Sequence, residues 1–385
     1  MTTFFNRRRG GRVLASLAVA TALLGTACGS DSDTSSSGST DSDTPAADSG
    51  LTPVRLQLQW FPQSQFAGYY AALGEGYYEE EGLDVEILAG SVEIVPQTVV
   101  DSSQAEFAVS WVPKTLASIE QGADLVEIGQ IFQRSGTTQV AWADSGIATA
   151  KDLADTKVGN WGYGNEFELL AGLKKAGIDP DTGVEMVQQN FDMTALINKE
   201  IDSAQAMTYN EFGLLLQTTD PETGELFQKE QFSVVNWNDE GTAMLNDALW
   251  AGGEWLEDEA NAEITVKFLK ASIKGWAFCR DNVEKCVQHV VDAGTELDEL
   301  HMTYMLNEVN DLVWPSPDGA GQIDEDSWKT TIDISLDSEL ITADPGTDVY
   351  DLSFLETALA ELEAEGVDVK GLGFTKVETD LSGAK

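Results

Sequence analysis

VRLQLQWFPQSQFAGYYAALGEGYYEEEGLDVEI, residues 54–87, contains the pattern that decides the fold. Its first seven residues are typical of a short strand that ends at Trp60. A helical pattern follows from Phe66 to Gly74, and a second strand is expected over Asp84–Leu88. Strand, helix and strand in this order predict a mostly parallel sheet with helices on its faces.

The same alternation continues along the chain in two series. The first ends with a strand near Phe132, and the second begins with the strand that stops at Trp161. Residues 137–153 separate the two series and are expected to carry the chain across, while Ala243–Trp255 would carry it back. The remainder reads as mainly helical. Two crossings predict two lobes joined by a hinge, with a cleft between them.

We therefore predict an α/β protein with two lobes of mostly parallel sheet flanked by helices. The chain is longer than one core usually serves, which supports two lobes. The expected organisation is a signal segment at 1–28, a linker at 29–52, the first lobe at 53–143, the second lobe at 144–242, the helical return of the first lobe at 243–372, and a tail at 373–385.

Four predicted strands stop on a tryptophan. These residues are Trp60, Trp111, Trp161 and Trp237, and each is followed by turn residues and a helical pattern. Ligands of open α/β sheets dock outside the carboxyl ends of the strands. Indole rings gathered there would suit planar or cationic small molecules. The alternative is that each tryptophan merely closes the top of a core; the repetition favours binding.

The first thirty residues have the architecture of an export signal. Four arginines precede an apolar segment from Val13 to Gly25, and Cys28 follows small residues as in a bacterial lipobox. The apolar segment is shorter than the roughly 20 residues of a membrane-spanning helix. Residues 29–50 are mainly Ser, Asp, Thr, Gly, Ala and Pro, a composition that predicts a flexible tether. We expect an exported protein, lipidated on Cys28 and anchored at the outer face of the cytoplasmic membrane.

The charge of the chain excludes one class of partner. Removal of the signal would take away four arginines and no acids, which leaves 18 basic against 66 acidic side chains and a net charge near −48. Nucleic-acid binding depends on basic side chains that neutralise phosphates, so no nucleic-acid partner is expected. Because the acids are spread along the whole chain, they favour a solvated surface over a site that recruits cations.

Two cysteines remain beyond Cys28. In one unbroken helix Cys279 and Cys286 would lie about 10 Å apart, too far for a disulfide. Residues 280–282, however, resemble a helix end followed by a new N-cap. A turn there would bring the thiols together, and an oxidising location favours the disulfide.

At this point the residues carry a family resemblance. Residues 54–87, together with SGIATAKDLADTKVG (145–159), GNEFELLAGLKKAGID (164–179) and FDMTALINKEIDSAQAMTYNE (191–211), resemble bacterial solute-binding proteins of the SsuA/ThiY type, which share a fold with thiamine-pyrimidine synthases. The resemblance implies a type II periplasmic-binding-protein fold and delivery of a small solute to the permease of an ABC importer. We expect a monomer.

The resemblance also implies where a ligand binds. It places contacts on residues from both lobes: Trp60, Phe66, Tyr69, Ser110, Trp111, Gln133, Trp161, Asn165, Glu166, Tyr209, Asn210 and Glu211. The strand-end pattern adds Trp237. From the residues alone, Asn165 would offer helix N–H groups to a ligand, and Asn210 and Glu211 would accept from ring N–H or amino groups. The alternatives are an ordinary N-cap for Asn165 and helix-dipole partners for Glu166 and Glu211.

The residue inventory favours binding over catalysis. The two histidines, His289 and His301, lie in the helical region far from the strand ends, and no cysteine and histidine cluster has the spacing of a zinc site. The related synthases need a cysteine-rich iron motif, which this chain lacks. We therefore expect no catalytic residues, no metal and no cofactor.

The ligand class is left with alternatives. The resemblance favours a thiamine pyrimidine of the formylaminopyrimidine or hydroxymethylpyrimidine type, whereas four indoles would also suit the larger riboflavin. A quaternary ammonium compound in a tryptophan cage is a third possibility, and a surface adhesion or carbohydrate-binding module is a fourth. A sulfonate is least favoured, because Arg134 is the only basic residue placed close to a strand end.

Overall fold

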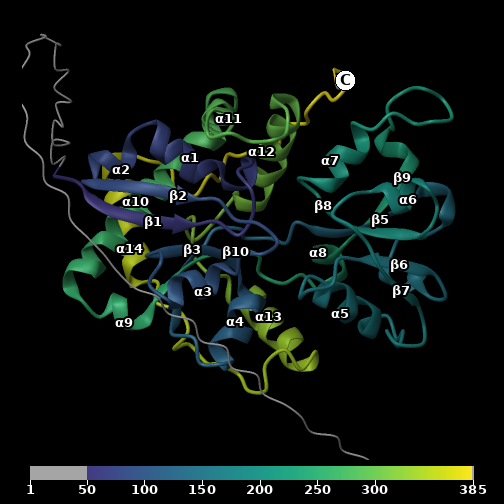
Figure 1. Cartoon of the computed structure of the whole chain (residues 1–385), viewed down its shortest axis with the longest axis horizontal. Coiled ribbons are helices and arrows are strands. Elements are labelled where there is room, and N and C mark those ends of the chain that lie inside the picture. The colour runs from purple at the N-terminus through teal and green to yellow at the C-terminus, as the bar shows by residue number, and fades with distance from the viewer. Residues whose placement is uncertain (1–49, 384–385) are drawn as a thin grey trace, which may run out of the picture. The chain divides into compact units, whose positions relative to one another are not determined.

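A computed structural model describes residues 50–383 and arranges them around two five-stranded sheets (Figure 1). The sheet of the first lobe has the order β2 (Leu83–Leu88), β1 (Thr52–Gln57), β3 (Phe107–Trp111), β10 (Asp247–Gly252) and β4 (Leu125–Gln130). Strand β10 runs antiparallel to both of its neighbours, and β1 pairs in parallel with β2 and β3. The described residues do not include the predicted signal segment with Cys28, nor most of the predicted linker.

The sheet of the second lobe repeats this design. Its order is β7 (Glu185–Gln188), β6 (Lys157–Asn160), β8 (Ser203–Met207), β5 (Thr137–Trp142) and β9 (Phe232–Asn236). The single antiparallel strand is again the fourth, β5.

Strand β5 corrects one expectation from the sequence. The sequence predicts that residues 137–153 connect the lobes, yet residues 137–142 pair with β8 on one side and β9 on the other. The first five residues of β5 are buried because the strand has neighbours on both edges and helices over its faces. The chain therefore passes between the sheets before Thr137, over residues 131–136, and returns just before Asp247.

Helices cover both sheets. Those before the first crossing are η1 (Ser64–Phe66), α1 (Ala67–Gly74), α2 (Tyr77–Glu80), α3 (Pro96–Asp101) and α4 (Val112–Glu120). The second lobe has η2 (Ala143–Ser145), η3 (Ala150–Leu153), α5 (Phe167–Lys175), α6 (Thr194–Ile197), α7 (Glu211–Leu216), η4 (Lys229–Gln231) and α8 (Trp237–Glu240). The return to the first lobe has α9 (Gly253–Leu256), α10 (Glu259–Asp281), α11 (Val283–Asp292), α12 (Glu299–Val313), α13 (Glu325–Asp337) and α14 (Ser353–Glu365).

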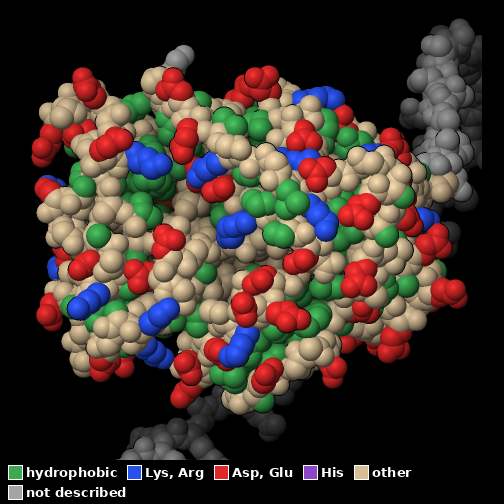
Figure 2. All heavy atoms as spheres, turned by 180° about the vertical axis from the view of Figure 1, so that it is seen from behind, with side chains coloured by type: hydrophobic (Ala, Val, Ile, Leu, Met, Phe, Trp, Pro, Cys, Tyr) green, Lys and Arg blue, Asp and Glu red, His purple; other side chains and the backbone are tan. Residues whose placement is uncertain are grey.

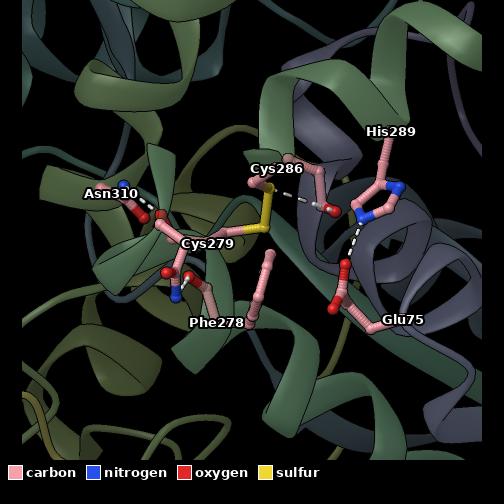
Figure 3. Close-up of a disulfide and its surroundings, with 8 residues drawn as sticks. Glu75, Phe278, Cys279, Cys286, His289 and Asn310 are labelled. Atoms are coloured by element: carbon pink, nitrogen blue, oxygen red, sulfur yellow. Dashed lines mark hydrogen bonds and ion pairs between the residues drawn. A yellow bond between two sulfur atoms is a disulfide. The ribbon is translucent and has the colours of Figure 1, made fainter. Parts of the chain in front are cut away.

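Helices α1 and α10 pack at unusually close range. A Cβ atom on Gly275 would stand 2.0 Å from the carbonyl oxygen of Gly68, so only glycine allows this approach. At the end of α10 the chain turns at Asn282, and Cys279 and Cys286 form a disulfide with their Cα atoms 5.1 Å apart (Figure 3). Beside the disulfide, His289 Nε2 lies 2.6 Å from Oε1 of Glu75, the residue that follows α1.

The hinge is held by side chains as well as by backbone. Asn246 Oδ1, on the returning crossing, accepts a hydrogen bond from the backbone N–H of Gly136 on the outgoing crossing, at 3.0 Å. Glu168 Oε1 of α5 accepts from the backbone N–H of Met244 at 2.6 Å. Burial raises the pKa of the Glu168 carboxyl to about 7. The two crossings are thus tied to each other and to the second lobe.

A third connection joins the lobes through the C-terminal segment, residues 374–381. Lys376 Nζ pairs with Glu308 of α12 at 2.8 Å, and Thr379 Oγ1 accepts from Asn307 Nδ2 of the same helix. Further on, Leu381 packs against the core cluster around Phe227 in the second lobe. The predicted tail is therefore a strap that contacts both lobes.

The surface of the described residues agrees with the charge count. On the face shown in Figure 2, acidic side chains are scattered over the whole surface and are not gathered in one patch. None of the helices in residues 50–383 combines the length and hydrophobicity that a membrane span requires.

Candidate functional site

Asp247 is the polar centre of the junction between the lobes. As the first residue of the antiparallel strand β10, it lies opposite Trp111, the last residue of β3. Its side chain accepts three hydrogen bonds, from Gln59 Nε2 at 2.6 Å, Trp111 Nε1 at 2.8 Å and Gln65 Nε2 at 2.8 Å. Only 2% of the residue is exposed, and this burial raises the pKa of the carboxyl to about 7 despite the three donors.

Aromatic rings from the two lobes meet beside this junction. Phe191, in the loop that follows β7, lies 5.2 Å from Trp60 of the first lobe between ring centroids. Its other neighbour is Trp161, immediately after β6, at 5.7 Å and with the planes 26° apart. Phe191 is 41% exposed, whereas the indole N–H of Trp161 is buried and has no hydrogen-bond partner among the described residues. These three rings form a contact between the lobes and are called the three-ring surface.

Lys114 crosses from the first lobe to the second. It lies in the first turn of α4, with its ammonium nitrogen 4.7 Å from the ring centroid of Trp111. The ammonium donates to Asn165 Oδ1 at 2.7 Å, in the loop before α5. Burial lowers the pKa of Lys114 to about 8, and the charges of Glu166 and Asp247 oppose that shift.

Other first-lobe residues on the predicted list serve the core or their own backbone. Phe66 and Tyr69 are buried in the main core cluster, and burial followed by the charge of Asp247 raises the pKa of Tyr69 well above its usual value. Ser110 belongs to the strand face opposite that of Trp111. Gln133 Nε2 donates to two carbonyl oxygens of the first lobe, at 2.6 and 2.9 Å.

The polar residues predicted after β8 are largely used within the protein. Glu211 accepts from the backbone N–H of Met207 at 2.9 Å and from Asn210 Nδ2 at 2.9 Å. Asn210 Oδ1 also lies 3.1 Å from His301 Nε2 of α12. Tyr209 packs edge-on against Phe132 of the outgoing crossing, at 6.0 Å. Glu211 therefore closes its own helix turn, and Tyr209 and Asn210 contact the first lobe and the crossing.

The strand-end pattern of tryptophans holds only in part. Strand β1 ends at Gln57, so Trp60 lies in the following loop, while Trp111 ends β3 and Trp161 follows β6. Trp237 begins α8 and is 0% exposed in a core cluster of the second lobe, where its ring fills the space left by Gly172. The prediction that Trp237 contacts ligand is corrected, because its ring is sealed under α5, away from the three-ring surface.

Comparison with known proteins now decides the family. The NMT1/THI5 like family model matches residues 63–285, more than half of the chain. The chain belongs to this family.

Relatives with assigned names cover different parts of this family member. A "Putative thiamine biosynthesis protein" from Haemophilus influenzae is 24% identical over 48% of this chain and 59% of its own length. The "Formylaminopyrimidine-binding protein" of Halalkalibacterium halodurans is 22% identical, over 75% of this chain and 86% of that protein. "Riboflavin-binding protein RibY" of Chloroflexus aurantiacus is 27% identical, over 69% and 73%.

Enzymes and solved structures also match this family member. A "4-amino-5-hydroxymethyl-2-methylpyrimidine phosphate synthase" from Legionella pneumophila is 27% identical over 38% of this chain. The crystal structure of a putative periplasmic sulfonate-binding protein SsuA from Methylobacillus flagellatus superposes with a TM-score of 0.61 at 16% identity, over 86% of this chain and 99% of that one. This likeness shows the fold, which is the two-lobed periplasmic-binding-protein fold predicted from the sequence.

Sequence reasoning missed several residues at the junction. Asp247, Lys114 and Phe191 were not predicted, nor were Gln59 and Gln65. One signal was present, because Asp247 is an acid at the start of an apolar strand, DALWAG, where a charge is costly unless it has a use. Lys114 lies three residues after the predicted strand end at Trp111 and carried a similar signal.

The lobes are in close contact around the site. A cavity bordered by Trp111, Pro113, Asn165 and Met244 has a volume of about 10 Å³, at the lower limit for one water molecule. A ligand of the size of a pyrimidine therefore requires the lobes to separate or the side chains to move. Within residues 50–383 no group of three or more His, Cys, Asp or Glu side chains is placed to hold a metal ion.

Proposed function

We propose that this protein is an exported, lipid-tethered receptor that captures an aminopyrimidine of the thiamine type and delivers it to an ABC importer. One observation carries the proposal. Aromatic rings of both lobes meet beside Asp247, a buried carboxyl wrapped by neutral donors. A planar heterocycle that inserts between the rings would bridge the lobes and so couple binding to closure.

The chemistry of the site matches this ligand class. Offset stacking on Trp60, Phe191 and Trp161 favours a flat ring. An exocyclic amino group of an aminopyrimidine would donate to Asp247. A protonated ring nitrogen would in addition favour the ionised form of this carboxyl, and hydrogen bonds to an ionised acceptor are the stronger ones. The donors from Gln59 and Gln65 hold the Asp247 side chain in place before the ligand arrives, which lowers the cost of ordering the site.

The relatives support the pyrimidine first and riboflavin second. One relative is named for formylaminopyrimidine and another for riboflavin, and the isoalloxazine ring is also planar and rich in N–H and carbonyl groups. A surface adhesion module would present tryptophans on one flat exposed face, whereas Trp111 and Trp161 are buried at the lobe junction. Some relatives are named as synthases. For this chain we propose that it binds its ligand without catalysis.

A ligand titration tests the proposal. Intrinsic tryptophan fluorescence is followed while formylaminopyrimidine, hydroxymethylpyrimidine, riboflavin, choline and betaine are added separately. We expect saturable quenching by an aminopyrimidine; a response to riboflavin alone would select the alternative ligand, and a response to choline or betaine alone would overturn both.

Variants locate the binding site. Trp60→Ala and Trp161→Ala should each weaken binding by roughly 1–3 kcal/mol if the rings stack on the ligand. Trp328→Ala is the control, because this tryptophan packs on Tyr350 in a separate core cluster of the first lobe. Unchanged affinity in both site variants would contradict the proposed stacking.

A further inference from the structure

Lys114 has fewer protein partners than its half-buried ammonium group can bind. An ammonium has three N–H donors, yet the contacts of Lys114 are one amide oxygen, Asn165 Oδ1, and the face of Trp111. Among the described residues, Lys114 forms no ion pair with a carboxylate, although the charges of Glu166 and Asp247 act on it from farther away. Within residues 50–383, two of its donors are therefore left without a protein acceptor.

The position of Lys114 explains why this deficit matters. A charge taken out of water is costly unless hydrogen bonds and an opposite charge compensate it. Lys114 could avoid the cost by extending into solvent, as lysines on helix surfaces usually do. It is instead directed across the junction to Asn165 of the other lobe, so the donors are kept where a ligand between the lobes would meet them.

Trp111 connects Lys114 to Asp247. The indole N–H of Trp111 donates to Asp247 Oδ1, and the ammonium of Lys114 lies over the face of the same ring. The two opposite charges are thus neighbours of one side chain but do not form an ion pair with each other. A separated pair of this kind offers an acceptor at one end of the site and donors at the other.

We infer that Lys114 recognises an oxygen acceptor on the ligand, such as a formyl or ring carbonyl, a carboxylate or a phosphate. The inference rests on the proposed receptor function and adds a ligand class to it. The ligand has N–H donors that reach Asp247 and, on the same molecule, an oxygen that accepts from Lys114. A nitrogen heterocycle without such an oxygen leaves the ammonium unsatisfied and binds less well.

A matched pair of ligands tests this. The probes are 4-amino-5-aminomethyl-2-methylpyrimidine and its N-formyl derivative, which differ by the formyl group, and calorimetric affinities are measured on the wild-type protein and Lys114→Met. The wild-type protein should prefer the formyl compound. Lys114→Met should weaken binding of the formyl compound about 10- to 100-fold, the range for a hydrogen bond to a charged group, and leave the amine unchanged or tighter. The ratio of the two affinities should therefore be closer to one in Lys114→Met than in the wild-type protein.

A second pair identifies the kind of oxygen. 4-Amino-5-hydroxymethyl-2-methylpyrimidine is compared with its phosphate ester on the same two proteins. A loss confined to the formyl compound assigns a carbonyl acceptor, and a larger loss on the ester assigns an anionic one; either supports the inference. Equal affinity ratios in wild type and Lys114→Met for both pairs would overturn it.

Controls separate this inference from the proposed function and from misfolding. Lys151→Met removes an exposed lysine of the second lobe and should change neither ratio. Lys114→Gln keeps a donor and should restore part of the formyl preference, which a purely structural role would not produce. Should riboflavin be the ligand, its ring carbonyls replace the formyl group and Lys114→Met should weaken riboflavin by a similar factor. Failure of every heterocycle to bind the wild-type protein would instead overturn the proposed function.

Discussion

Replacement of Asp247 by asparagine should change how the stability of the protein depends on pH. Asp247→Asn keeps the size of the side chain and removes its ability to ionise. Burial raises the pKa of Asp247 from 3.8 to about 7. Because a pKa difference of one corresponds to about 1.4 kcal/mol, ionisation of this carboxyl costs roughly 4 kcal/mol more in the folded protein than in the unfolded chain.

The sign follows from proton linkage. The folded protein holds the Asp247 proton up to about pH 7, whereas the unfolded chain loses it near pH 4, so the free energy of unfolding falls as pH rises between these values. In the wild-type protein this contribution is fully present below about pH 4 and lost above pH 7. In Asp247→Asn it is absent, and the variant should become more stable relative to wild type as pH rises.

The assay is urea unfolding at several pH values from 4.5 to 8, followed by tryptophan fluorescence and circular dichroism. The difference in unfolding free energy between wild type and variant removes contributions from other buried acids, such as Glu127 and Glu168, whose raised pKa values are common to both proteins. We expect this difference to change by most of the roughly 4 kcal/mol across the range. A difference that stays constant with pH would show that Asp247 titrates normally, and the argument that burial raises the pKa of this carboxyl would fail.

Three further predictions follow from the core, the strap and the disulfide. Trp237→Ala should lower the free energy of unfolding by about 3–5 kcal/mol, measured by chemical unfolding, but leave ligand affinity unchanged, in contrast to Trp161→Ala. A folded Trp237→Ala protein with weaker ligand binding would show that Trp237 belongs to the site. A stop codon in place of Lys376 removes the strap, and small-angle scattering should then show a larger radius of gyration for the ligand-free protein; an unchanged radius would contradict a restraining role. Cys279→Ser together with Cys286→Ser should lower stability by about 2 kcal/mol, the chain-entropy value for a short loop; no change in the unfolding midpoint would contradict it.

The local elements of this fold were readable from the sequence. The part of the chain after the second crossing, predicted to be mainly helical, contains α10, Glu259–Asp281, and α14, Ser353–Glu365. Asn282 ends one helix and precedes the next, as the turn residues indicated. Such features depend on near neighbours in the chain, through hydrophobic periodicity and capping, and a sequence records them directly.

The site was harder to predict because its residues are joined over long distances in the chain. Asp247 receives hydrogen bonds from Gln59 and Gln65 at separations of 188 and 182 residues. The exposed Phe191 gains its role only from two tryptophans that the fold brings to it. In contrast, Trp237 shares the strand-end pattern of the other tryptophans, but its ring is buried in a core cluster of the second lobe.

The amino-acid sequence by itself determined the alternation of strands and helices and the two-lobed class of the fold, because these follow from periodicity and turn residues within short windows. It did not identify the antiparallel strands β5 and β10, which lie in the stretches predicted as crossings. Only the tertiary structure decided which tryptophans face the junction, which carboxyl is buried between them, and that Lys114 reaches Asn165 of the opposite lobe. The physical reason is that burial and charge at a point depend on all the elements that pack around it. No single segment of the chain carries that information.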